Sequence, residues 1–436
     1  MSAPPAVLAV AVFVATYFLI ATERIHRVAA AVGGVALMAI LGIVDTETAF
    51  YSERSGIDWN VIFLLFGMMI VVSILKQTGL FDYLAVWAAQ RSRGRPFRLM
   101  ALLMTVTATA SALLDNVTTV LLMAPVALMV CRRLGLDPVP YLITLAFSSN
   151  VGGAATLIGD PPNIIIASRA GLSFNDFLVH MTPIVIVMQV LLLGLAWLLF
   201  RRRLDARAGR AGDLADTICD LSPGDEIRDR RMLRRCLVVL ALVMVGFSLH
   251  SVLHVQPSLI ALLGAWLMVL VSGAHPAQFL EEVEWPTLAF FMALFVLVGG
   301  LVETGVIGNL GEAAVAATGD QSFAAASFLL FGSAVLGAFV DNIPYTTAMA
   351  PVVQDLVASL PAAEGQSLWW AFALGADLGG NTTAVAAGAN VVIIGIAARN
   401  GTPVSFWEFT RYGLIVTAMT LVVAWAYVWA RYFAFA

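Results

Sequence analysis

Long apolar runs constrain the fold of this sequence more than any other feature. Ten runs of 15 to 31 residues carry almost no charge, and charged residues make up only 12% of the 436 positions. A soluble domain carries about 25% charged residues, so this chain could not cover a water-facing surface. The runs are continuous rather than alternating, unlike the strands of a membrane β-barrel. The sequence therefore predicts an all-α polytopic membrane protein whose main solvent is the lipid bilayer.

The expected crossings fall five on each side of a charged stretch. They are 6–21, 28–44, 59–75, 139–168, 177–200, 237–254, 258–272, 285–302, 368–398 and 406–432. From this spacing we predict a first repeat over residues 1–200, a cytoplasmic linker over 201–235 and a second repeat over 236–436.

Two further apolar segments, 99–133 and 322–360, are interrupted near their middles by "LLDNVTT" and "FVDNIPYTT". One helix of that length would measure about 50 Å at 1.5 Å per residue, whereas the hydrocarbon core is about 30 Å thick. We therefore predict two re-entrant hairpins with polar tips.

Basic residues suggest the orientation. Arginines flank the first hairpin and are dense in 201–235, and basic loops of membrane proteins face the cytoplasm. Both termini are then expected outside the cytoplasm, in a multi-pass protein of the bacterial inner membrane.

The two halves also repeat one another in sequence. Trp59 matches Trp285 and Asp115 matches Asp341, both 226 residues apart, and Asn163 matches Asn390 at an offset of 227. Because each half has an odd number of crossings, the second half is expected to be inverted. Inverted repeats with interrupted helices are typical of secondary transporters, whose binding sites lie near the midplane.

The polar residues within the apolar segments gather at the hairpin tips and in two broken helices, 139–168 and 368–398. Glycine pairs, and Pro161–Pro162 in the first of these, predict unwinding in the membrane. Such backbone is tolerated where it lines a cavity, and intramembrane carboxylates usually serve a function. The candidate substrate- or ion-binding residues are Asp115, Asn116, Thr118, Asn150, Thr156, Asp160, Asn163, Asp341, Asn342, Asp377, Asn381, Thr383 and Asn390.

A purely structural interpretation of these residues stays open. Aspartates can hold the hairpin tips as protonated or hydrogen-bonded helix breakers, and asparagines can satisfy unpaired backbone groups. No nucleophile–base pair or nucleotide motif indicates an enzyme, and the three cysteines lack the spacing of a metal site. We expect no catalytic residues, no cofactor and no nucleic-acid partner.

The motifs resemble the ion transporter superfamily, most of all its arsenite/antimonite permease and P-protein branch. The similarity is carried by "SALLDNVTTVLLMAPV", "SNVGGAATLIGDPPNIIIAS", "FVDNIPYTTAMAPVV" and "GADLGGNTTAVAAGANVVIIGIAARNG". Divalent-anion relatives typically have serine where this chain has Asp115 and Asp341. Two carboxylates would repel a dicarboxylate unless they were protonated or sodium-bound, which argues against an anionic substrate.

The resemblance implies an alternating-access exporter of trivalent metalloid hydroxide, arsenite or antimonite, coupled to proton entry. A sodium/proton antiporter is the alternative, and an anion transporter or an uncoupled channel is a weaker one. The expected partners are a small inorganic substrate, a coupling proton or sodium ion, and lipid. A soluble ATPase could also associate, as it does with some arsenite permeases.

Overall fold

The chain is entirely helical wherever its structure is described. The computed structural model describes residues 4–22, 25–52, 54–205, 223–273, 275–318, 322–360 and 362–434, and no β-strand occurs among them. About half of the expected linker, residues 206–222, lies outside the described residues. The predicted all-helical membrane fold is confirmed.

The first half contains the helices up to the linker. They are α1 (Pro5–Ala21), α2 (Arg27–Ile40), α3 (Thr46–Phe50), α4 (Trp59–Gln77), α5 (Leu80–Ser92), α6 (Pro96–Leu113), α7 (Asn116–Arg133), α8 (Pro138–Gly153), α9 (Pro161–Ala170), α10 (Phe174–His180) and α11 (Thr182–Asp205).

The second half follows a short 3-10 helix, η2 (Pro223–Asp225). Its helices are α13 (Arg230–Leu253), α14 (Pro257–Ser272), α15 (Pro276–Leu280), α16 (Trp285–Glu303), α17 (Val306–Thr318), α18 (Ser322–Gly337), α19 (Asn342–Ala358), α20 (Ala362–Gly379), α21 (Gly388–Arg399) and α22 (Phe406–Tyr432).

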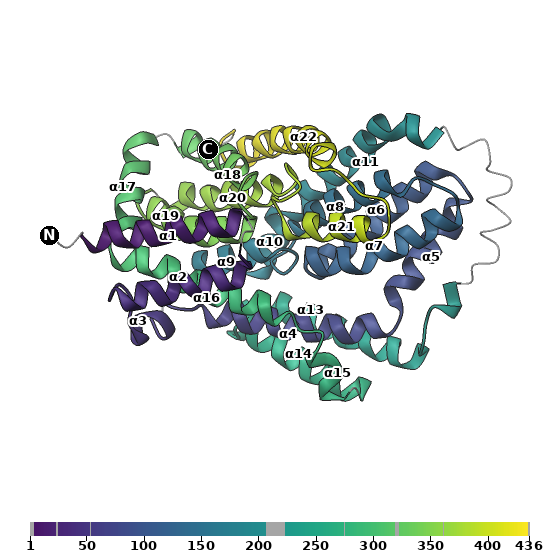
Figure 1. The fold of residues 1–436 in the computed structure, drawn as a ribbon, viewed down its shortest axis with the longest axis horizontal. Helices are drawn as coiled ribbons and strands as arrows, with labels where there is room; N and C mark the ends of the chain where they lie inside the picture. Colours follow the sequence, from purple (N-terminus) through teal and green to yellow (C-terminus); the bar gives the residue numbers. More distant parts are fainter. Residues whose placement is uncertain are drawn as a thin grey trace.

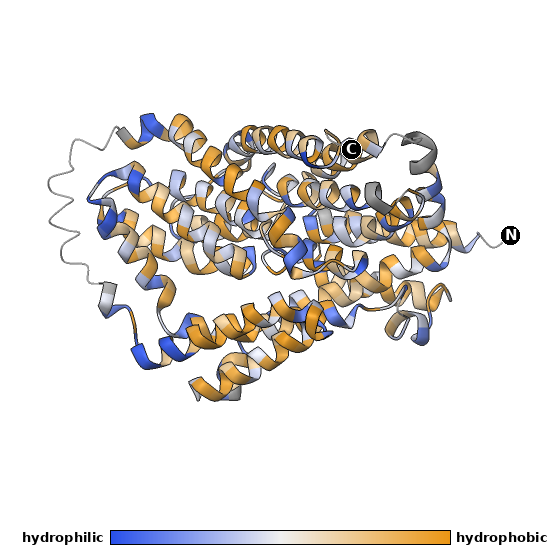
Figure 2. Cartoon of the chain, turned by 180° about the vertical axis from the view of Figure 1, so that it is seen from behind, coloured by the Kyte–Doolittle hydropathy of each residue, from blue (hydrophilic) through white to orange (hydrophobic). Residues whose placement is uncertain are grey.

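Seven of the described helices are long and apolar enough to cross a bilayer: α4, α6, α7, α11, α13, α16 and α22. Shorter apolar helices, among them α1, α2 and α14, occupy other expected spans. Hydrophobic residues cover most helices, whereas hydrophilic ones gather toward the ends of the molecule and near its centre (Figure 2). This distribution fits a multi-pass membrane protein.

The two halves are interleaved. Helices α1 and α2 of the first half pack with α16 of the second, and α13 and α14 of the second half pack with α4 of the first (Figure 1). Matching pairs also recur within the halves, since α6 packs on α8 as α18 packs on α20. The inverted orientation of the halves stays a prediction.

Each predicted hairpin is a pair of helices that meet at a polar tip. Helix α6 ends at Leu113 and α7 starts at Asn116, while α18 ends at Gly337 and α19 starts at Asn342. At 1.5 Å per residue the 18-residue α6 and α7 are each about 27 Å long. Whether these pairs re-enter on one side stays a prediction.

The two broken helices unwind where glycine and proline predict. Helix α8 ends at Gly153 and α9 resumes at Pro161, and α20 ends at Gly379 and α21 resumes at Gly388. Pro161 takes the first helical position, where its missing N–H costs nothing. Each break lies beside a hairpin of the opposite half, because α9 packs on α19 and α21 packs on α7.

Glycine permits the close crossing of α8 and α6, and this yields a testable prediction. A Cβ added at Gly152 would lie 2.3 Å from the backbone oxygen of Ala108. Gly152→Ala should therefore push the helices apart, cost about 1–3 kcal/mol, and lower the melting temperature of the detergent-solubilised protein. The control is Gly194→Ala on α11, where nothing lies within 4 Å of the added atom. An unchanged melting temperature for Gly152→Ala would contradict the packing described.

Candidate functional site

A cavity of about 390 Å³ lies where the two hairpin tips approach helices from both halves. Val117 and Ile343 line it from the starts of α7 and α19, Pro161 from α9 and Gly388 from α21. The ionisable residues of its lining are His26, Arg27, Asp115, Glu284 and Asp341. We call this cavity the tip pocket.

Asp115 and Asp341 have matching positions in it. Each is the N-cap of the second helix of its hairpin, with one carboxylate oxygen accepting a backbone N–H. The bond from Thr118 to Asp115 is 2.7 Å, and the bond from Ile343 to Asp341 is 3.1 Å. Aspartate is a favoured N-cap residue, which explains why an acid is tolerated at the start of each helix. Both aspartates also line the tip pocket.

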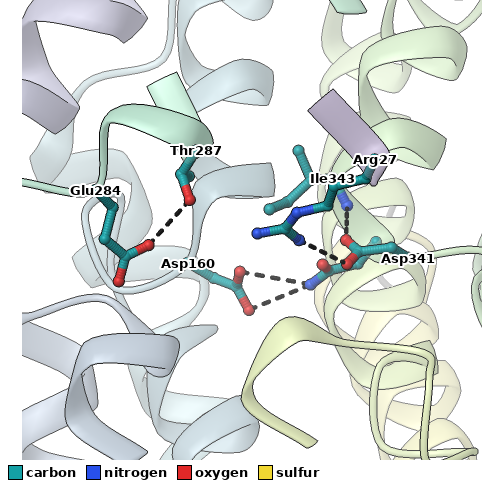
Figure 3. A network of polar contacts seen from close by, with 7 residues as sticks. Arg27, Asp160, Glu284, Thr287, Asp341 and Ile343 are labelled. Carbon is teal, nitrogen blue, oxygen red and sulfur yellow. Dashed lines mark hydrogen bonds and ion pairs between the residues drawn. The ribbon is translucent and has the colours of Figure 1, made fainter. Parts of the chain in front are cut away.

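Arg27 lies within ion-pair distance of Asp341. Its guanidinium Nη1 is 4.0 Å from Asp341 Oδ2 (Figure 3). Its Cζ lies 5.3 Å from the ring centroid of Phe290. Glu284, which precedes α16, accepts a 2.9 Å hydrogen bond from the hydroxyl of Thr287. In the part of the chain that the structure describes, the lining thus holds three carboxyl groups and one guanidinium.

Arg27 and Glu284 were not predicted from the sequence, because all of the predicted site residues lie inside polar interruptions of the apolar segments. Both precede or begin a helix at the edge of an apolar run. One signal was available, because Glu284 lies 226 residues after Asp58, which caps α4 just as Glu284 precedes α16.

Asp160 connects the two hairpin tips. Its side chain is buried at the end of the first break and accepts hydrogen bonds from Asn116 Nδ2 at 2.8 Å and from Asn342 Nδ2 at 3.4 Å. Figure 3 shows the second contact, on the side of Asp160 that faces Asp341. One carboxylate from a broken helix therefore joins the amides of both predicted hairpins.

Hydrogen bonds between asparagine side chains extend the polar network from Asn116. Asn116 Nδ2 lies 3.4 Å from Asn150 Oδ1, and Asn150 Nδ2 donates to Asn381 Oδ1 at 3.1 Å and to Asn390 Oδ1 at 3.0 Å. All four side chains are buried. Residues from both halves thus form one continuous polar network.

Four candidates hold backbone rather than line the tip pocket. Thr156 donates to the carbonyl of Ala112, and Thr383 donates to the carbonyl of Ala338, which ties each break to its hairpin. Asn163 Nδ2 donates to the carbonyls of residues 153 and 156, and Asn390 Nδ2 to those of residues 380 and 383. These bonds recur at the offsets found in the sequence. Thr118 lies outside the lining and contributes its N–H to Asp115.

Asp377 is set apart from the tip pocket. It is fully buried in the last turn of α20, and neither carboxylate oxygen has a hydrogen-bond partner within bonding distance. Asn163 lies near enough to interact with it, and Asn163 Oδ1 also lacks a partner.

An interleaved helical bundle with paired tips, broken helices and a central charged pocket defines a membrane transporter. The sequence profile of CitMHS, described as "Citrate transporter", matches residues 17–375. The chain belongs to this family of the ion transporter superfamily.

Relatives agree with this assignment. An uncharacterized transporter of Mycobacterium tuberculosis is 53% identical over 431 residues, covering 98% of this chain and 99% of that protein. A 46 kDa membrane protein of Mycobacterium leprae is 51% identical, with 98% and 99% coverage. The mouse P protein is 36% identical over an alignment covering 96% of this chain but 59% of the P protein.

Two solved transporters share the fold. The YdaH transporter of Alcanivorax borkumensis aligns with a TM-score of 0.55 at 15% identity, covering 98% of each chain. MtrF of Neisseria gonorrhoeae, described within a class of antimetabolite efflux pumps, aligns with a TM-score of 0.60 at 10% identity, covering 100% of this chain and 96% of its own.

Proposed function

We propose that this protein is a secondary active transporter that exports a small uncharged hydroxide in exchange for protons. The candidate cargoes are arsenous acid and its antimony counterpart, and the coupling carboxyls are Asp115 and Asp341, with Asp160 and Asp377 assisting. The protein would lie in the bacterial inner membrane with both termini outside the cytoplasm. A soluble ATPase could dock on the linker over residues 201–235.

The observation that carries the proposal is that, among the described residues, Asp115, Glu284 and Asp341 line one pocket with a single guanidinium, that of Arg27. Three carboxyl groups disfavour an anion unless they are protonated or metal-bound. An uncharged trihydroxide could donate hydrogen bonds to carboxylates and accept them from amides. The family description names citrate, but the described lining offers a citrate trianion three carboxyl groups and only one guanidinium.

Sodium/proton antiport is the second candidate, and one specific observation favours it. The carboxyl groups of Asp115, Glu284 and Asp341 line the tip pocket, and carboxylate oxygens are among the ligands that hard cations prefer.

A pump-deficient bacterium expressing the chain separates the two candidates. Growth would be scored on graded arsenite and antimonite, and in parallel on graded sodium at alkaline pH. We expect a rise in metalloid tolerance without a rise in sodium tolerance. A gain in sodium tolerance alone would replace the metalloid proposal with sodium/proton antiport.

Arg27→Gln tests the charge of the tip pocket. Because Arg27 is half-exposed and 4.0 Å from Asp341, its loss should strengthen binding of a monovalent cation by at most about 1 kcal/mol, roughly fivefold. The measurement is the sodium concentration that half-saturates the rise in melting temperature of the purified protein. Arg91→Gln, on exposed α5 surface, is the matched control. Weaker sodium binding in Arg27→Gln would contradict the assigned role.

A further inference from the structure

Asp377 and Asn163 form a buried pair whose polar groups lack partners. Both side chains are completely buried, and Asp377 Oδ1, Asp377 Oδ2 and Asn163 Oδ1 all lack a hydrogen-bond partner. Asn163 is nevertheless close enough to interact with Asp377. Buried polar groups in proteins are rarely left unpaired, because each costs about 1–3 kcal/mol. The pair thus presents three buried acceptor atoms without a donor, and a proton on the Asp377 carboxyl would supply one.

The internal repeat places an equivalent pair of residues in the other half of the chain, and there a hydrogen bond joins the two side chains. At the offset of 227, Asn150 corresponds to Asp377 and Asn390 corresponds to Asn163. Asn150 Nδ2 donates to Asn390 Oδ1 at 3.0 Å. The surroundings also match, because Asn163 and Asn390 each hold the equivalent pair of backbone carbonyls. The two pairs thus occupy equivalent places, but a carboxyl group at residue 377 replaces the amide donor that Asn150 supplies.

We propose that Asp377 is a proton-binding site, with the bound proton shared as an O–H donor to Asn163 Oδ1. A protonated carboxyl has the one donor that a carboxylate lacks, so it completes the bond that the asparagine pair makes in the other half. In the binding step, the Asp377 carboxylate takes up one proton from the solvent and becomes a carboxylic acid. The proposal rests on the proposed function only in naming where a coupling proton is held.

The surroundings connect this site to the tip pocket. Asp160, which precedes α9, is the ionisable neighbour that interacts with Asp377 electrostatically. The other helices packed on α20 are α8, α18, α19 and α22. Because Asp160 also contacts both hairpin amides, a proton arriving at or leaving Asp377 changes the charge balance directly behind the tips.

Infrared spectroscopy of the full chain in lipid nanodiscs tests the proposal without any cargo. At neutral pH the difference between wild type and Asp377→Asn should contain the C=O band of one protonated carboxyl group, lost in the variant. Asp377→Asn should still fold, since its amide can donate to Asn163 as Asn150 donates to Asn390. Asp82→Asn on α5 controls for the loss of an aspartate elsewhere.

A swap variant uses the repeat as a second control. Asn150→Asp in the Asp377→Asn background moves the carboxyl to the equivalent position opposite Asn390, so the protonated band should return. The proposal is overturned if Asp377→Asn removes a carboxylate band instead, or if that band shifts with sodium but not with potassium, which would make Asp377 a cation ligand. Failure of metalloid transport would leave the infrared result unaffected, so the two proposals fail separately.

Discussion

Asp115→Asn should reduce arsenite transport driven by a pH gradient to the level of protein-free vesicles. The substitution keeps a side-chain oxygen that can accept the 2.7 Å hydrogen bond from Thr118 N, so the cap of α7 should survive. It removes the only group at that position that can bind and release a proton. The measurement is arsenite movement in proteoliposomes with an imposed pH gradient.

The same vesicles provide the control for this prediction. Asp82→Asn, on α5 outside the lining of the tip pocket, should transport like the wild type. Equal melting temperatures for both variants would show that Asp115→Asn is folded. Proton-driven transport at the wild-type rate in Asp115→Asn would rule out Asp115 as a coupling group.

Asp160→Ala should destabilise the protein and stop transport together. Its loss leaves the amides of Asn116 and Asn342 without their shared acceptor, at about 1–3 kcal/mol for each buried donor left unpaired. Asn116 can turn to Asn150 Oδ1, 3.4 Å away, so the larger loss is expected at Asn342. Removing a buried charge offsets part of this cost, but it does not restore the link between the tips.

Asp160→Asn removes the negative charge but keeps a side-chain oxygen that can still accept a hydrogen bond from Asn116 or Asn342. This variant therefore distinguishes the effect of the charge from that of the hydrogen bonds between the tips. We expect melting temperatures to fall in the order wild type, Asn variant, Ala variant, with transport lost first in the Ala variant. A stable and active Ala variant would show that the tips need no common acceptor.

Much of the fold follows from local sequence signals. The breaks at 154–160 and 380–387 lie where glycine pairs occur, and Pro161 starts α9 because its fixed φ suits a first helical turn. The hairpin tips lie at the two "DN" pairs for a related reason, since aspartate is a preferred N-cap. The exchange of helices between halves was not predicted, because apolar helix faces carry little information about their partners.

The candidate site was predicted less completely than the fold. Asp115 and Asp341 were expected to meet, and both line the tip pocket. Arg27 and Glu284 also line the pocket, although they lie at the starts of α2 and α16, outside the polar interruptions. Their position depends on how α2 and α16 pack together, which the sequence does not indicate. Sequence also could not distinguish Thr156 and Thr383, which hold backbone carbonyls, from residues that face the cavity.

The central claim is that the two hairpin tips share one water-filled pocket. Single cysteines at Val117 and Ile343, two uncharged lining positions, would be introduced after Cys131, Cys219 and Cys236 are replaced by serine. We predict that a membrane-impermeant maleimide labels both sites from the same side of the membrane, and that a short bifunctional thiol reagent bridges the double variant within one chain. Labelling of neither position, or of the two from opposite sides with no bridge formed, would contradict a shared pocket.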